Sequence, residues 1–260
     1  MAIADSYDGF LIDLDGVVWL GHEPIDGAAE ALAELKTAGK PVVFVTNSPR
    51  VTPAEQARVL RSQGIDAAQE QVVTAGQTLL ELTRAEVGEG AKVYAIGTHG
   101  FLEQVSGDGF GLLSEDDWEE AAAVLVTGHP RFNYDELKAA SMAARTGAFL
   151  ATIGRDPTMP MPDGLWPGTG SIVAAVETAS GRRAAVAGKP EKPIFDLGRK
   201  VLALPAGSKV AMVGDRLDTD VGGARNAGLD GILVRGNDTH APGTRVTPDH
   251  EIDSLLDLLA

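Results

Sequence analysis

Four clusters of polar residues stand out in the sequence, and three of them directly follow short apolar runs. The clusters are Asp13-Leu14-Asp15 after residues 10–12, Thr46-Asn47-Ser48 after residues 42–45, residues 214–220 after residues 210–213, and Gly188-Lys189-Pro190. In a parallel α/β sheet, ligands bind beyond the carboxyl ends of the strands. We therefore expect these side chains to meet at one edge of a sheet and to form a ligand site.

Four negative charges would come together at that edge, those of Asp13, Asp15, Asp215 and Asp220. Two unit charges ~4 Å apart repel by roughly 4 kcal/mol at an effective dielectric constant of about 20, so the cluster needs a cation. Its ligands would all be oxygens, which favours a hard divalent ion such as Mg²⁺. Because Mg²⁺ combines a few carboxylates with phosphate oxygens, the cluster indicates a phosphate substrate. Thr46, Asn47 and Lys189 would supply donors and positive charge for its oxygens.

The elements that must position these residues alternate between short apolar runs and longer helical patterns. Buried strands are predicted at residues 10–12, 41–45, 209–213 and 231–234, and helices at 28–38, from 52 onward, at 221–227 and at 252–259. Thr52-Pro53-Ala54-Glu55 has the capping-box pattern of a helix start. Apolar runs without polar alternation, joined by helices, indicate a parallel sheet that is covered on both faces.

The middle of the chain has an αβ pattern of its own. Strand-like runs at residues 93–96, 124–127 and 149–153 alternate with predicted helices near 115–121 and 134–146. We expect this region to be a second domain inserted into the first. The predicted boundaries are residues 1–83 plus 184–260 for the core domain and residues 84–183 for the inserted domain.

The composition excludes several classes of protein. The 260 residues include 22 Lys and Arg against 37 Asp and Glu, a net charge of −15, which gives no electrostatic basis for binding a nucleic acid or an anionic membrane surface. The absence of cysteine excludes disulfides, thiolate catalysis and cysteine-bound metals. No apolar run approaches the roughly 18 residues of a membrane span. Residues 1–8 lack the basic region of a signal peptide, so we expect a cytoplasmic protein.

The four clusters together resemble the motifs of the haloacid dehalogenase (HAD) superfamily. Residues 10–17 resemble motif I, Val45-Thr46-Asn47 motif II, Gly188-Lys189-Pro190 motif III, and residues 214–220 motif IV. Their form is similar to class IIA, which includes NagD-type, 4-nitrophenyl, phosphoglycolate and glycerol-3-phosphate phosphatases. The resemblance implies a Rossmann-like parallel-sheet core with an inserted αβ cap domain (C2 type). It also implies a Mg²⁺-dependent phosphatase that acts on small-molecule phosphomonoesters through an aspartyl-phosphate.

The resemblance also implies individual functions, carried over by position. Asp13 resembles the nucleophile, and Asp15 the general acid that later serves as the base. Asp13 and Asp215 would bind Mg²⁺ through their side chains and Asp15 through its backbone carbonyl, with Asp220 orienting these ligands. Thr46, Asn47 and Ser48 would bind the phosphoryl oxygens, and Lys189 would neutralise charge on the nucleophile and the phosphate.

Two alternatives to a phosphatase stay open. A phosphotransferase or mutase would share the phospho-aspartate step. A signalling module, as in receiver domains, would also combine acidic residues with Mg²⁺, although receivers carry the phosphorylated Asp on a middle strand. Carbon–halogen cleavage is disfavoured, because the dehalogenases of the superfamily lack an acid at the position of Asp15. The resemblance further implies that a homodimer could form through the cap.

The inserted domain is expected to select the substrate. The core motifs contain groups for a phosphoryl group and nothing shaped for the rest of a molecule. Loops 154–158 and 162–167 contribute a cation, an acid and an aromatic ring, namely Arg155, Asp156 and Trp166. His129 follows a predicted strand of this domain and is a further candidate to face the site.

Overall fold

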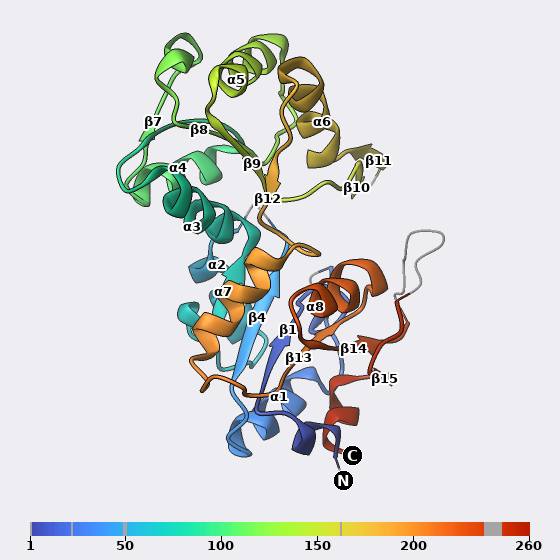
Figure 1. The fold of residues 1–260 in the computed structure, drawn as a ribbon. Helices are drawn as coiled ribbons and strands as arrows, with labels where there is room; N and C mark the ends of the chain where they lie inside the picture. The colour runs from blue at the N-terminus through green and yellow to red at the C-terminus, as the bar shows by residue number, and fades with distance from the viewer. Residues whose placement is uncertain (1, 22, 49–50, 162, 237–245) are drawn as a thin grey trace. The chain divides into compact units, whose positions relative to one another are not determined.

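The chain divides into two compact units (Figure 1). The computed structural model describes residues 2–21, 23–48, 51–161, 163–236 and 246–260. The core unit consists of Met1–Thr46, Pro53–Thr74 and Lys189–Ala260, and the inserted unit of Asn47–Thr52 and Ala75–Gly188. No helix in the described parts is both long and apolar enough to cross a membrane.

The core unit is built on a six-stranded parallel sheet with the order β15-β14-β13-β1-β4-β5. Its strands are β1 (Gly9–Ile12), β4 (Val42–Thr46), β5 (Val72–Thr74), β13 (Val210–Gly214), β14 (Asp230–Val234) and β15 (His250–Ile252). Every residue of β1, β4 and β13 is buried, as expected for strands covered on both faces. Ile12 lies beside Val213 on β13 and Phe44 on β4. The polar residues that follow these strands therefore leave the same edge of the sheet.

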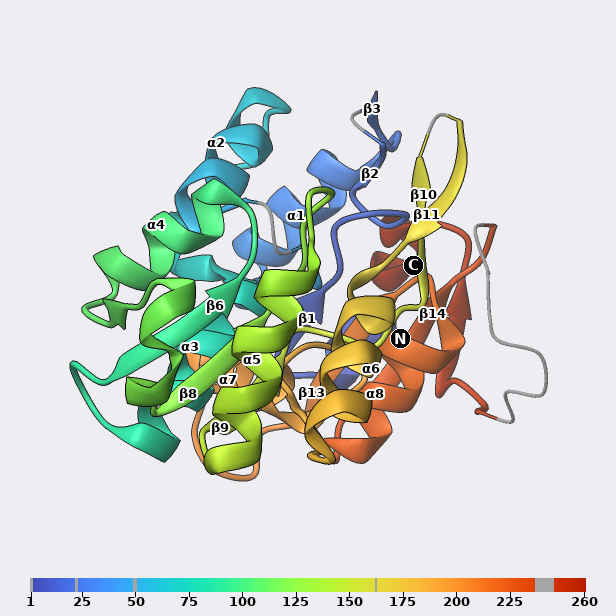
Figure 2. The same ribbon diagram turned by 90° about the horizontal axis from the view of Figure 1, so that it is seen from above.

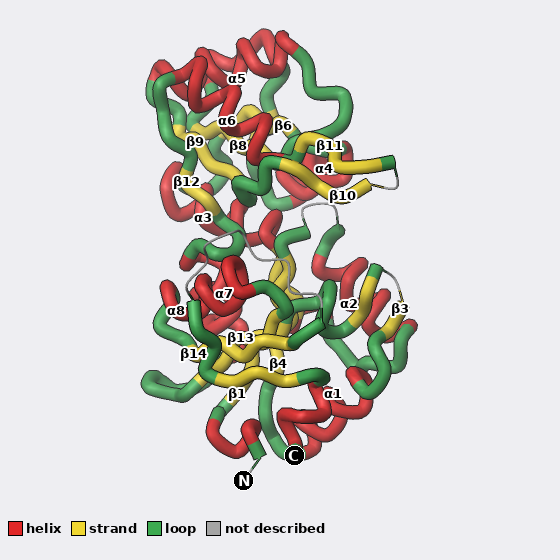
Figure 3. The backbone as a smooth tube through the Cα atoms, turned by 90° about the vertical axis from the view of Figure 1, so that its right-hand side faces the viewer, coloured by secondary structure: helices red, strands yellow, loops and turns green. Residues whose placement is uncertain are grey.

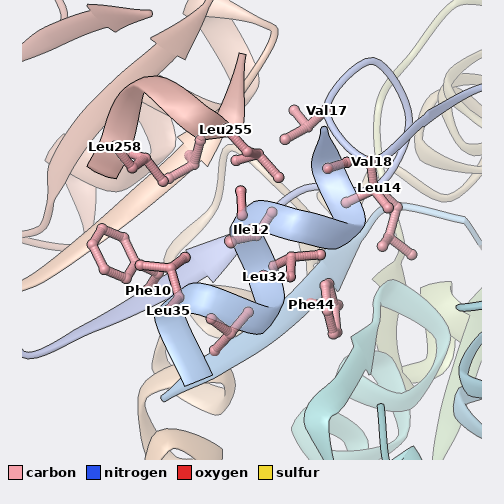
Figure 4. Packing of buried hydrophobic residues seen from close by; sticks show 14 of the residues in the cluster. Phe10, Ile12, Leu14, Val17, Val18, Leu32, Leu35, Phe44, Leu255 and Leu258 are labelled. Carbon is pink, nitrogen blue, oxygen red and sulfur yellow. The ribbon is translucent and has the colours of Figure 1, made fainter. Parts of the chain in front are cut away.

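Helices cover both faces of this sheet (Figure 3). They are α1 (Ala28–Thr37), α2 (Pro53–Ser62), α7 (Lys192–Leu202) and α8 (Gly222–Asn226). Phe10 and Ile12 pack into one cluster with residues of α1 and of the C-terminal 3-10 helix Leu255–Leu259 (Figure 4). Leu11 points to the opposite face, where a Cβ on Gly198 of α7 would lie 2.9 Å from Leu11 Cδ2. Burying a side chain of this size contributes about 1.5–3 kcal/mol.

The C-terminal segment differs from the single helix predicted over residues 252–259. Ile252 instead pairs with Val234 of β14 and ends β15, and a 3-10 helix follows. The Asp257 side chain explains the break, because its Oδ2 accepts hydrogen bonds from the backbone N–H groups of Asp253 (2.8 Å) and Ser254 (3.0 Å). The remaining short elements of the core unit are the 3-10 helices Ile3–Ser6 and Gln69–Gln71, the hairpin of β2 (Trp19–Leu20) and β3 (Glu23–Pro24), and the π-helical turn Leu217–Val221.

The inserted unit has its own five-stranded parallel sheet, with the order β12-β9-β8-β6-β7. Its strands are β6 (Lys92–Ile96), β7 (Gly111–Leu112), β8 (Ala123–Val126), β9 (Phe149–Thr152) and β12 (Ala185–Val186). Its helices are α3 (Ala75–Val87), α4 (His99–Gly107), α5 (Tyr134–Thr146) and α6 (Thr169–Ser180), with a 3-10 helix at Glu115–Glu120. Helices α5 and α6 lie side by side on one face of this sheet (Figure 2). An antiparallel hairpin of β10 (Thr158–Met161) and β11 (Gly164–Pro167) precedes α6.

The two units divide the chain at different places from the predicted boundaries. Besides Asn47–Thr52, the inserted unit contains a segment that begins at Ala75 rather than near residue 84, because α3 packs on β8 and β9. It runs to Gly188 rather than to residue 183, because Ala185 and Val186 pair with β9. A two-residue strand such as β12 is too short to give a recognisable apolar run in the sequence.

Candidate active site

Asp13 is the first residue after β1, and the hydrogen-bonded ladder to β13 continues through it. Its backbone N–H donates to Val213 O at 2.9 Å, which fixes Asp13 at the end of β13. The side chain is buried, and its Oδ1 accepts a hydrogen bond from Leu14 N at 2.8 Å. Lys189 Nζ lies 2.8 Å from the same oxygen. Two donors on one oxygen therefore hold the carboxylate in a single orientation.

Lys189 brings the third motif to the same edge of the core sheet. Its Nζ lies 2.6 Å from Asp220 Oδ1 and 3.5 Å from Val45 O, in addition to its contact with Asp13. Burial acts to lower the pKa of Lys189, but the carboxylates of Asp13 and Asp220 outweigh it and hold that pKa above its ordinary value. The core unit thus contains a buried ammonium group between two carboxylates.

Three carboxylates share this buried region. Asp13, Asp215 and Asp220 each offer an oxygen that lies within 4.8 Å of the other two. Burial, followed by repulsion from Asp13 and Asp220, raises the pKa of Asp215 to about 7. Burial also raises the pKa of Asp220, although Lys189 acts in the opposite direction. A single lysine therefore does not balance the negative charge of the cluster.

This surplus of negative charge fits a divalent cation. The donor atoms are all oxygens, which Mg²⁺ prefers. Asp220 uses both of its oxygens within the protein, Oδ1 for Lys189 and Oδ2 for the backbone N–H of Arg216 at 3.1 Å. Asp220 thereby holds the lysine and the start of the loop that follows β13. Asp13 and Asp215 are the two side chains of the cluster that fit a cation site.

Two glycines allow the carboxylates to approach so closely. Gly16 has a φ of +82°, and a Cβ at this position would overlap Asp215 Oδ2. Gly214 precedes Asp215, and a Cβ there would overlap the side chain of Asp220. Neither glycine was expected from the sequence to have a function of its own. The sequence feature that could have identified them is that each glycine is adjacent to a motif aspartate. Glycine is favoured where the backbone closely approaches a polar group.

Asp15 differs from the other motif aspartates because it is exposed. Its Oδ1 accepts a hydrogen bond of 2.9 Å from the indole Nε1 of Trp19. Trp19 is only 4% exposed and belongs to the main hydrophobic cluster of the core unit. This contact was not expected from the sequence, because a spacing of four residues in a loop has no distinctive pattern.

The residues predicted to bind the phosphoryl oxygens follow one another at the end of β4. Thr46 is the last residue of that strand and is buried. Asn47 and Ser48 are half-buried and belong to the inserted unit. Gly188 also belongs to that unit, and a Cβ there would lie 2.7 Å from Asn47 Oδ1. Asn47 of motif II therefore lies against Gly188 of motif III within the inserted unit. Within the core unit, Val45 of motif II likewise lies near Lys189 of motif III, with 3.5 Å between Val45 O and Lys189 Nζ.

Arg155, the cation predicted to help select the substrate, is bound within the inserted unit. Its Nη1 and Nη2 donate to the Glu177 carboxylate at 3.0 and 2.7 Å, and Nη2 also donates to Ala184 O at 3.0 Å. A bidentate pair of this kind fixes the guanidinium, so Arg155 stabilises the inserted unit. Asp156, the next residue, is exposed. In the second predicted loop, residue 162 lies outside the described residues.

His129 and Trp166 also make contacts within the inserted unit. His129 Nε2 lies 2.6 Å from Glu136 Oε1, and its Nδ1 accepts a hydrogen bond from the backbone N–H of Arg131 at 3.3 Å. Both ring nitrogens are thus used near the start of α5. Trp166 is on β11, and its Nε1 donates to Asp163 Oδ1 at 2.9 Å. The Trp166 side chain is half-buried on the hairpin of β10 and β11.

The sequence is similar to bacterial phosphatases over most of its length. An acid sugar phosphatase of Staphylococcus haemolyticus is 35% identical over 230 residues, which are 88% of this chain and 86% of the relative. The model of the haloacid dehalogenase-like hydrolase family matches residues 10–111, and a second HAD-hydrolase-like model matches residues 186–258. The chain belongs to the haloacid dehalogenase-like hydrolase family. These matches confirm the resemblance to the HAD superfamily that the four motifs indicate.

Further relatives of this HAD hydrolase are known in sequence and in structure. D-glycerol 3-phosphate phosphatase of Mycobacterium tuberculosis is 36% identical over 234 residues, which are 90% of this chain but 64% of the relative. The structure of a glycerol phosphate phosphatase from that organism has been solved in complex with magnesium. It superposes with a TM-score of 0.86 at 33% identity, and the match covers 99% of this chain and 78% of the relative's chain. A p-nitrophenyl phosphatase from Archaeoglobus fulgidus has a TM-score of 0.88 at 27% identity and covers 98% of both chains. The predicted α/β fold, a parallel-sheet core with an inserted αβ domain, is confirmed.

Proposed function

We propose that this HAD hydrolase is a Mg²⁺-dependent phosphatase that hydrolyses small-molecule phosphate monoesters through a phosphoryl group on Asp13. The observation that carries the proposal is the buried pair of Asp13 and Lys189 beside Asp215. This arrangement provides an oriented carboxylate, a cation next to it and a second carboxylate for a metal ion. The phosphatase names of the relatives support the same reaction class.

In the first half-reaction, Asp13 attacks the phosphorus atom of the ester. A bond forms between a carboxylate oxygen of Asp13 and phosphorus, and the ester P–O bond breaks. Asp15 gives its proton to the departing oxygen, so the leaving group departs as a neutral alcohol. Mg²⁺, held by Asp13, Asp215 and the backbone carbonyl of Asp15, would supply positive charge to the phosphoryl oxygens.

In the second half-reaction, water attacks the phosphorus of the aspartyl-phosphate. Asp15 takes a proton from the water, the bond between Asp13 and phosphorus breaks, and inorganic phosphate leaves. Asp13 is restored as a carboxylate, and Asp15 is again protonated for the next turnover. The exposure of Asp15 suits this alternation, because water must reach it between the two steps.

The other motif residues would bind the phosphoryl group. The hydroxyl and amide groups of Thr46, Asn47 and Ser48 are assigned to its oxygens. Lys189 would offset the charge that gathers on the phosphoryl group and on Asp13. Asp220 keeps the Lys189 ammonium group in place through their 2.6 Å contact.

The substrate we propose is a small phosphate monoester. The relatives are named acid sugar phosphatase, D-glycerol 3-phosphate phosphatase and 5'-nucleotidase, and sugar phosphates, glycerol phosphate and nucleotides are all small phosphate esters. We assign recognition of the leaving group to the inserted unit, through the exposed Asp156 and the hairpin residue Trp166. Arg155 is not included, because its guanidinium is bound to Glu177.

The test is the release of inorganic phosphate from a panel of sugar, glycerol and nucleotide monophosphates, with Mg²⁺ and with excess chelator. The proposal expects Mg²⁺-dependent release and no release by the Asp13→Asn variant. A phosphotransferase would pass the phosphoryl group to an added alcohol without releasing phosphate. A signalling module would stop at one phosphoryl group per chain. Either result would overturn the hydrolytic function.

A further inference from the structure

The indole of Trp19 binds the carboxylate of Asp15, with 2.9 Å between Trp19 Nε1 and Asp15 Oδ1. We propose that Trp19 is a positioning residue, which holds the exposed Asp15 carboxylate in the orientation for proton transfer in both half-reactions. This inference rests on the proposed function, because it assigns Trp19 a task in that reaction.

The loop that carries both residues is closed by the backbone as well. Gly16 N donates to Trp19 O at 2.7 Å, and Trp19 N donates to Leu14 O at 3.2 Å. Asp15 and Trp19 also form an isolated β-bridge. The indole ring is buried in the main cluster of the core unit, which includes Val17 and Val18. The donor therefore comes from a fixed ring, whereas the acceptor is a side chain that reaches solvent.

The chemistry of an indole nitrogen suits this task. Its N–H group can donate a hydrogen bond but cannot accept one. Trp19 therefore cannot remove the proton that Asp15 transfers. The indole N–H donates to Asp15 Oδ1 whether the Asp15 carboxyl group is protonated or ionised. The proton is thus assigned to Oδ2, which would face the leaving oxygen in the first step and the attacking water in the second.

If Trp19 positions Asp15, removing the indole N–H should lower the turnover number by an amount that depends on the leaving group. Replacing Trp19 by Phe keeps an aromatic ring and removes the N–H donor. For glycerol 3-phosphate, whose alkoxide needs a proton, we expect turnover to fall on the order of 10- to 100-fold, as for a displaced catalytic group. For 4-nitrophenyl phosphate, whose phenolate leaves unprotonated, formation of the phosphoenzyme should change little. Its hydrolysis should slow, which produces a burst of 4-nitrophenolate before the steady state.

The experiment measures both substrates on the same preparations of the wild type, Trp19→Phe, Asp15→Asn and the double variant. Loss of folded protein cancels from the ratio of the two phosphoenzyme formation rates, measured by rapid mixing. The proposal expects Trp19→Phe to change this ratio in the wild type and not in the Asp15→Asn background, because Trp19 acts through Asp15. Trp118→Phe, a change to a half-buried tryptophan of the inserted unit, is the control and should leave the ratio unchanged.

Equal losses on the two substrates in Trp19→Phe would overturn the positioning function and leave the phosphatase intact. The positioning function is equally overturned if Trp19→Phe changes the ratio as much in the Asp15→Asn background. A wild type that releases phosphate from neither substrate would instead overturn the proposed function and, with it, the inference on Trp19. The two failures are therefore distinguishable.

Discussion

Lys189 Nζ and Asp220 Oδ1 lie 2.6 Å apart in an ion pair whose side chains are only 3% and 0% exposed. The two residues are separated by 31 positions in the chain. Because Lys189 Nζ also lies 2.8 Å from Asp13 Oδ1, one buried ammonium group offsets the charge of two carboxylates. Removing the lysine leaves both buried carboxylates without compensation, which costs more than the loss of a surface pair.

The first prediction concerns this pair. Lys189→Met should lower the free energy of unfolding by about 3–5 kcal/mol, as measured by urea denaturation. Lys192 and Asp196 form a pair of similar length, 2.7 Å, but their side chains are about half exposed. Lys192→Met is therefore the matched control, and only a small change is expected. An equal loss of unfolding free energy in Lys189→Met and Lys192→Met would contradict the claim that burial makes the Lys189 pair more costly to break.

The second prediction concerns the metal ion. Mg²⁺ should raise the midpoint of thermal unfolding, and Asp215→Asn should remove most of this gain together with nearly all turnover. Because the pKa of Asp215 is about 7, a proton competes with the ion below that pH. The metal-free protein loses stability as the pH rises toward 7 and Asp215 ionises, so the gain from Mg²⁺ should be larger at pH 8 than at pH 6. Asp196→Asn is the control, and full activity in excess chelator would refute the metal site.

The third prediction concerns Gly16. Gly16→Ala should abolish most activity and weaken Mg²⁺ binding, because its Cβ would overlap Asp215 Oδ2 and the backbone has a φ of +82°. Gly21 has a similar φ of +68°, but among the described residues no atom outside its chain neighbours lies within 4 Å of a Cβ there. Gly21→Ala thus separates backbone strain from displacement of Asp215, and should cost about 1 kcal/mol of stability with activity kept. Similar activities of the two variants would contradict this account.

The fourth prediction concerns the pH dependence of stability in the inserted unit. The hydrogen bonds from Arg155 hold the pKa of Glu177 below its ordinary value, although burial opposes them. A lowered pKa stabilises the folded state above the ordinary value near 4.5, and this stabilisation is lost as the pH falls through the folded-state pKa. Glu177→Gln should therefore weaken the dependence of unfolding on pH below about 5, whereas Glu119→Gln at an exposed site should not. An unchanged profile in Glu177→Gln would count against the pair.

The fifth prediction concerns substrate preference. Trp166→Ala and Asp156→Ala should reorder the ranking of small phosphate esters, while turnover of 4-nitrophenyl phosphate stays within a few-fold. Tyr134→Ala, which removes an aromatic ring that is 78% exposed elsewhere on the inserted unit, should leave the ranking unchanged. A ranking that responds only to changes in the core unit, such as Thr46→Ser, would show that the inserted unit does not select the substrate.

Three of the four motifs could be predicted from their position, because each of them follows a fully buried strand. Apolar runs such as residues 10–12 and 210–213 are recognisable without knowledge of the fold, and Asp13 and Asp215 follow them. Parallel pairing then brings the strand ends together. The local pattern of an apolar run followed by an aspartate thus predicts where these charged groups lie in the core sheet.

Contacts between distant residues could not be predicted in the same way. Arg155 looks like a free cation in its loop, and only the fold places Glu177 against it. Gly16 and Asp215 are far apart in the chain, so the space that a Cβ would occupy is visible only in the structure. For Asp15 and Trp19, the difficulty is different, because their spacing also suits one face of a helix.

The inserted unit begins and ends at residues of the motifs themselves. Thr46 and Asn47 belong to different units, as do Gly188 and Lys189. A chimaera that takes residues 75–188 from a relative would therefore import a new Gly188 but keep the host's Asn47 and Ser48. Recombination at these cuts would preserve the reaction only if the joined halves of motif III are compatible. An exchange of the whole inserted unit therefore has to take residues 47–52 together with residues 75–188.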